Sequence, residues 1–133
     1  MAFQYSTTVR NAFLDNVETT ISTAPTLEIR TGAVPANCAA ADSGTVLVTM
    51  TLPSDWMAAA SSGTKALSGT WQDTSADATG TAGHFRLKQG ATTHIQGTVT
   101  VTGGGGDLTV DNTSIATGQT VTITSFTLTA GGS

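Results

Sequence analysis

Two histidines are the residues that most readily suggest a metal or acid–base site. His84 and His94 lie on segments 84–88 and 92–101, which read as a hairpin around Gln89-Gly90. A two-residue turn would put the imidazoles on opposite faces of the hairpin, whereas a three-residue loop would put them on one face. Even on one face they would supply only two nitrogens, with no Cys or carboxylate at ligand spacing. We therefore predict no metal site.

The carboxylates likewise form no recognised catalytic or calcium-binding pattern. They are Asp15, Glu18, Glu28, Asp42, Asp55, Asp73, Asp77, Asp107 and Asp111. A pair for glycoside hydrolysis would meet only in the fold, and its cleft would need aromatic platforms, whereas aromatic residues are 5% of this chain. There is no G-x-S-x-G elbow, and the run 103–106 lacks the Gly-Lys-Ser/Thr end of a phosphate loop. We predict that the protein is not an enzyme and needs no cofactor.

Three other side chains have a structural and a functional interpretation. Cys38 is the single cysteine and has no cationic neighbour in the sequence, so it reads as a small apolar filler. Trp56 and Trp71 are either core residues or anchors of an interface with another protein, since Trp is enriched at binding hot spots. Trp56 follows Pro53 in an irregular segment and is the better anchor candidate.

Composition restricts the classes of partner. Charged residues are 11% of the chain, against about 25% in ordinary domains, and the net charge is −4. The five Lys and Arg residues are spread singly, so no patch for nucleic acid is visible. A soluble monomer normally keeps a mixed, charged surface. A surface of Ser, Thr, Ala and Gly instead predicts that part of the protein is covered in its working state.

No targeting or membrane segment is visible. The first residues lack a basic region followed by an apolar run, and no stretch approaches the ~20 apolar residues that span a bilayer. We expect synthesis in a cytoplasm, from which the chain leaves only inside something larger, and no membrane partner.

The sequence predicts one helix, near the start of the chain. Val9, Phe13, Val17 and Ile21 recur every four residues and Leu14 joins them, which predicts a helix over about 7–22. Ser6 or Thr7 can cap its first turn, and Pro25 prevents its continuation. We expect the apolar stripe to pack against a sheet, with a partner-binding face as the alternative. The other side of the helix carries polar residues, namely Arg10, Asn11, Asp15, Glu18 and Thr19.

Threonine alternating with aliphatic residues then predicts strands, because a period of two buries one face of a sheet. The expected strands are 26–31, 45–52, 64–71 with a bulge at Gly69, 84–88, 92–101, 107–111 and 120–129, with 72–83 a flexible polar segment and 54–60 ambiguous. We predict one domain over 1–133: an N-terminal helix and a β-sandwich, over about 26–129, or a jelly roll, of seven to eight antiparallel strands.

Four segments of the chain resemble those of a known family. They are the opening Ser-Thr-Thr-Val-Arg-Asn-Ala and the segments 26–33, 39–45 and 82–87. They are similar to small structural proteins of tailed bacteriophages and prophages, several of which are capsid cement or decoration proteins with jelly-roll folds. The resemblance implies a virion protein, made in the cytoplasm of a bacterial host, whose partner is the major capsid protein or another virion protein.

The resemblance fits a molecule that acts by covering area. Neutral β surface makes contacts with little desolvation of charge, and many weak copies bind strongly together. We expect a dimer or trimer, because edge strands with few charges invite pairing. A tail, baseplate or fibre component and a carbohydrate-binding β-sandwich stay open as alternatives.

Overall fold

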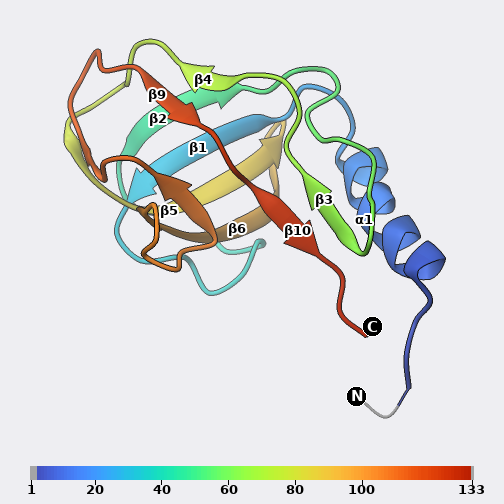
Figure 1. Ribbon diagram of the computed structural model, residues 1–133. Coiled ribbons are helices and arrows are strands. Elements are labelled where there is room, and N and C mark those ends of the chain that lie inside the picture. Colours follow the sequence, from blue (N-terminus) through green and yellow to red (C-terminus); the bar gives the residue numbers. More distant parts are fainter. Residues whose placement is uncertain (1–2, 133) are drawn as a thin grey trace.

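The computed structural model describes residues 3–132, which form one helix followed by ten short strands (Figure 1). Helix α1 spans Thr7–Ile21, close to its predicted range, and the side chain of Ser6 accepts a hydrogen bond from the N–H of Val9 as its cap. The strands are β1 (Thr26–Thr31), β2 (Val46–Thr51), β3 (Thr64–Ala66), β4 (Trp71–Asp73), β5 (Gly80–Gln89), β6 (Thr92–Val101), β7 (Leu108–Val110), β8 (Ser114–Ile115), β9 (Val121–Ile123) and β10 (Thr127–Thr129). The protein is mainly β with one N-terminal helix, as the sequence predicts.

The main sheet is mixed and curled. Its strand order is β2-β1-β5-β6-β7, and β8 pairs with the start of β5. The pairs β2–β1, β1–β5 and β5–β6 are antiparallel, whereas the pair β6–β7 is parallel. Register shifts interrupt the β1–β2, β1–β5 and β5–β6 pairs, and such bulges add twist and bend a sheet. The sheet therefore wraps around the core like one half of a barrel (Figure 1).

This arrangement differs from the predicted sandwich or jelly roll of seven to eight antiparallel strands. Opposite the main sheet lie two separate two-stranded sheets, β10–β3 and β4–β9. The predicted strand 120–129 is divided between them, because Phe126 turns into the core between β9 and β10. The predicted strand 64–71 is also divided, at Gly69, whose φ of 72° lies outside the range of a strand. Two long strands are thus replaced by four short ones with different partners.

The polar segment 72–83, predicted to be flexible, is anchored instead. Its first residues belong to β4 and its last to β5. Asp73 accepts a hydrogen bond from the Thr49 N–H at 3.1 Å, and Asp77 accepts one from the Thr49 hydroxyl at 2.7 Å. The N–H of Asp77 also donates to the Leu47 carbonyl. These contacts along β2 hold the segment against that strand.

The core fills the concave side of the main sheet. Leu27 and Ile29 of β1 lie opposite Leu87 and Phe85 of β5, so the period of two brings them to one face. Phe126 joins this face to the small sheets, with its ring centroid 5.9 Å from Phe85 and 5.5 Å from Trp71.

The other face of the main sheet carries a polar cluster, in which the buried cations Arg30, Arg86 and Lys88 meet the half-buried Glu28 and the exposed Asp42. The loop 32–44 covers this face and contributes Asp42. The Asp42 carboxylate accepts hydrogen bonds from Lys88 at 2.6 Å, from Arg86 at 2.8 Å and from Arg30 at 3.3 Å. Arg86 additionally donates to backbone carbonyls of the loop. The loop is therefore tied down by side chains of the strands beneath it.

Candidate interaction surface

Helix α1 is attached to the rest of the molecule by a row of polar side chains. Each member of the row accepts a hydrogen bond from a backbone N–H of the irregular segment 57–63: Asn11 from Gly63 at 2.9 Å, Asp15 from Ala60 at 2.9 Å and Glu18 from Met57 at 3.4 Å. Spacings of three and four residues place the row on one side of the helix, and the N–H groups that it meets are three residues apart. The row satisfies donors that have no strand partner in this irregular segment.

Lys65 of β3 completes this attachment. Its side chain is buried, and its ammonium lies 2.7 Å from Asp15 and 2.9 Å from Glu18. Burial alone would lower the pKa of Lys65, but the hydrogen bonds to the two carboxylates outweigh it and the pKa is raised. The hydrogen bond from Lys65, together with that from the Ala60 N–H, lowers the pKa of Asp15. The pair is therefore held in its charged form.

The orientation of α1 corrects the sequence-based expectation. Leu14 and Ile21 are buried as predicted, but Val9 and Phe13 are 39% and 48% exposed. The polar side of the helix faces segment 57–63, because its hydrogen bonds satisfy backbone groups there. That docking turns the N-terminal half of the apolar stripe outward, so this half matches the alternative of a partner-binding face.

Aromatic residues enlarge the exposed apolar area near the start of the chain. Phe3 is 60% exposed and packs edge-on against Tyr5, with ring centroids 5.5 Å apart, and Tyr5 packs in the same way against Phe13 at 5.2 Å. The N–H of Tyr5 donates to the Gly132 carbonyl at 2.6 Å, so the segment before α1 and the segment after β10 meet here. We call Phe3, Tyr5, Val9 and Phe13 the apolar patch.

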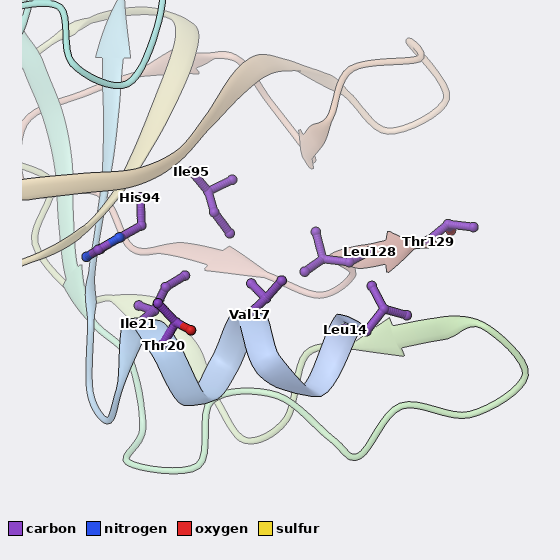
Figure 2. Close-up of a pocket in the computed structure, with 8 residues that line it drawn as sticks. All are labelled: Leu14, Val17, Thr20, Ile21, His94, Ile95, Leu128 and Thr129. Carbon is purple, nitrogen blue, oxygen red and sulfur yellow. The ribbon is translucent and has the colours of Figure 1, made fainter. Parts of the chain in front are cut away.

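A groove continues from the patch along α1. Figure 2 shows side chains of α1, β6 and β10 converging on it, in a volume of about 460 Å³. Its lining residues are Leu14, Val17, Thr20, Ile21, His94, Ile95, Leu128 and Thr129. Phe13 and Val17 are four residues apart and therefore neighbours on the helix surface. Patch and groove form one apolar tract on a molecule that otherwise exposes mostly threonine, serine, alanine and glycine.

The histidines occupy different environments. Strands β5 and β6 are joined through a two-residue turn, since Gln89 pairs with Thr92, and the register shift leaves His94 as an extra residue in β6. His94 lines the groove, whereas His84 is fully buried with its Nδ1 3.1 Å from the Gly32 carbonyl. Within residues 3–132, no three His, Cys, Asp or Glu side chains are grouped as a metal site would require.

The structure places both tryptophans in the core. Trp56 is 0% exposed and Trp71 is 1% exposed, and their ring centroids are 6.1 Å apart. The indole N–H of Trp56 donates to the Ser22 carbonyl at 2.9 Å, and that of Trp71 donates to the Trp56 carbonyl at 3.1 Å. The sequence left two alternatives for each tryptophan, a core residue or an interface anchor. Both positions agree with the core alternative, and neither indole is accessible to a partner in this structure.

Positive charge is concentrated inside the molecule. Four of the five Lys and Arg residues are buried, and each of the four is paired with at least one carboxylate. They are Arg30, Lys65, Arg86 and Lys88. Since Asp55, Asp107 and Asp111 are exposed, the outer surface is neutral to acidic and gives no cationic track for a phosphate backbone.

Sequence reasoning missed the apolar patch as a surface feature. The signal was present in the spacing, because Asn11, Asp15 and Glu18 form a second stripe as regular as the apolar one. What the spacing could not show is that segment 57–63 would leave three backbone donors unpaired and so attract the polar stripe.

Comparison with known proteins identifies no relative: no family model, curated protein or solved structure matches the chain. The resemblance to phage structural proteins therefore stays a prediction. Within the described residues, no helix has the length and apolar character needed to cross a membrane.

Proposed function

We propose that this protein is a virion structural protein that binds and stabilises the capsid shell, using the tract of apolar patch and groove beside α1. The observation that carries the proposal is the contrast between this exposed tract and the internal placement of nearly all positive charge. Apolar surface with one neighbouring cation, Arg10 of α1, suits a lasting contact with protein, since few ions must lose water when it forms.

The energetics fit a repeating lattice. An apolar area of this kind contributes about 25 cal/mol per Å² removed from water, so a small tract gives only weak binding for one copy. Copies that also contact each other bind with higher avidity. A protein that binds the assembled shell and not the free subunit also raises the stability of the assembled state by mass action.

Labelling of the chain on intact particles tests the location. The proposal expects label over the head in electron micrographs, at regularly repeated positions. Label confined to the tail would support the alternative of a tail, baseplate or fibre component and would contradict a cementing role.

The carbohydrate-binding alternative loses the residues on which it relied. Sugar platforms need exposed aromatic rings, whereas Trp56 and Trp71 are buried. Phe3 and Phe13 are exposed, but they lie in an apolar tract and not among polar groups that would orient a sugar ring.

A further inference from the structure

The junction between α1 and β1 has an unusual backbone. Ser22 has φ 77° and ψ −166°, a region that essentially only glycine occupies, and Ala24 has a φ of 49°. Neither residue is glycine, and both lie in the four-residue link 22–25 that joins the helix to the sheet. Because two of the four link residues have unfavourable backbone angles, the packed position of α1 strains the link.

Side chains of the body hold this link in place. The Trp56 indole N–H donates to the Ser22 carbonyl, and the Gln89 amide donates to the carbonyls of Ile21 and Thr23, all at 2.9 Å. Three successive carbonyls are thus bound to side chains of Trp56, in the segment between β2 and β3, and of Gln89, at the end of β5. A strained conformation persists when its surroundings fix it in this way.

We propose that α1 is an exchangeable arm, and that two copies of this chain form a dimer in which the α1 of each copy packs on segment 57–65 of the other. Short hinge segments under strain favour such domain swapping, because an extended link relieves the strain while the contacts of α1 with segment 57–65 are re-formed.

The match between helix and segment identifies the occupant as a second copy. Asn11, Asp15 and Glu18 meet backbone donors three residues apart, and the same row closes on the ammonium of Lys65. A second copy of the chain presents the same backbone donors and the same Lys65 ammonium at the same spacing. The helix of the first copy can therefore make its usual hydrogen bonds and ion pairs on the second copy.

Isotope-mixed cross-linking tests the exchange on the unmodified chain. Wild-type protein made in ¹⁴N and ¹⁵N forms is unfolded, mixed in equal amounts, refolded and treated with a carbodiimide. This reagent activates a carboxylate, which then loses the reagent as a urea when the Lys65 amine forms an amide with it. The proposal expects about half of the cross-linked peptides joining Lys65 to Asp15 or Glu18 to carry mixed isotopes. Peptides of one isotope only would overturn it.

A complementary charge pair gives a second test that does not depend on the cross-linking chemistry. Asp15→Lys and Lys65→Asp each break the attachment, whereas a swapped heterodimer of the two variants has the wild-type pair at one helix and a reversed Lys–Asp pair at the other. The proposal expects the refolded mixture to be dimeric and to melt above its separate components, at or above the melting temperature of the chain that carries both substitutions, which serves as the folding control. If that control folds and the mixture still melts like its separate components, α1 does not exchange.

The strain itself is tested with Ser22→Gly, which accommodates the packed link without cost. The fraction of dimer at micromolar concentration, measured by analytical ultracentrifugation, is expected to fall at least twofold relative to wild type. An unchanged or increased fraction, or a wild-type chain that is wholly monomeric, would contradict the proposal.

Discussion

At the scale of single residues, the ion pairs of Lys65 decide how α1 is held. Replacing Lys65 by Met keeps an unbranched apolar side chain, one atom shorter, but leaves Asp15 and Glu18 without their cation. Breaking a buried pair typically costs about 3–5 kcal/mol, and because both carboxylates reach solvent we expect a loss of about 2–3 kcal/mol in the free energy of unfolding. Urea denaturation measures it. Thr127→Ala, on the neighbouring strand, is the control and should change stability by less than about 0.5 kcal/mol.

Asp42 gives a pH-dependent prediction at the same scale. Its hydrogen bond from Lys88, with those from Arg86 and the charge of Arg30, lowers the pKa of the carboxyl below its ordinary value against the opposing effect of burial. A lowered pKa adds stability above the unfolded value of about 4, and this stability is lost as the pH falls through the folded value.

Asp42→Asn should therefore lose more stability at pH 7 than at pH 3, relative to wild type, in chemical denaturation at both values. Asp55→Asn removes an exposed carboxylate and is the matched control, with a small effect at both values. An equal loss at pH 3 and pH 7 for Asp42→Asn would show that the carboxylate charge does not hold the 32–44 loop.

At the scale of elements, the link after α1 predicts opposite effects for two adjacent substitutions. Ser22→Gly should raise the free energy of unfolding of the packed form by about 1 kcal/mol, since it removes a conformation that costs non-glycine residues about 1–3 kcal/mol. Thr23→Gly, at the next residue, should lower it by about 0.5–1 kcal/mol through backbone entropy. Thermal denaturation of the two variants compares them. The same sign for both would remove the argument for strain.

The close approach of β5 to the 32–44 loop gives another test at this scale. A Cβ on Gly83 would lie 2.2 Å from the carbonyl oxygen of Gly32. Gly83→Ala should destabilise the fold by about 1–3 kcal/mol, because backbone has to move, whereas a Cβ on Gly131 meets nothing within 4 Å. Gly131→Ala should leave the melting temperature unchanged, and equal melting temperatures for the two variants would contradict this packing.

Sequence patterning predicts some of these elements well and others poorly. The helix and the strands at 26–31 and 92–101 follow from local periodicity and turn residues, and they are confirmed. The division of 120–129 and the anchoring of 72–83 depend on contacts with distant segments, so no local pattern reports them. The exposed patch is a similar case, since only segment 57–63 determines which side of α1 turns outward.

For the molecule as a whole, the internal placement of four of the five Lys and Arg residues leaves the surface of the described residues poor in charge, with an apolar tract beside α1. This distribution is the basis for proposing a protein partner rather than nucleic acid. It also explains how a chain with 11% charged residues uses its few ion pairs, namely to fix a helix and a loop on a curled sheet.

The most direct test of the central claim is the heat resistance of virions assembled with wild-type protein, with the Val9→Ser/Phe13→Ser variant, or without the chain. Temperature-dependent release of DNA is followed with an intercalating dye, and Thr8→Ser, at another exposed helix position, controls for substitution as such. We predict release at a lower temperature without the chain and with the double variant, and wild-type behaviour for the control. Equal release temperatures for particles with and without the chain would contradict its role as a shell-stabilising protein.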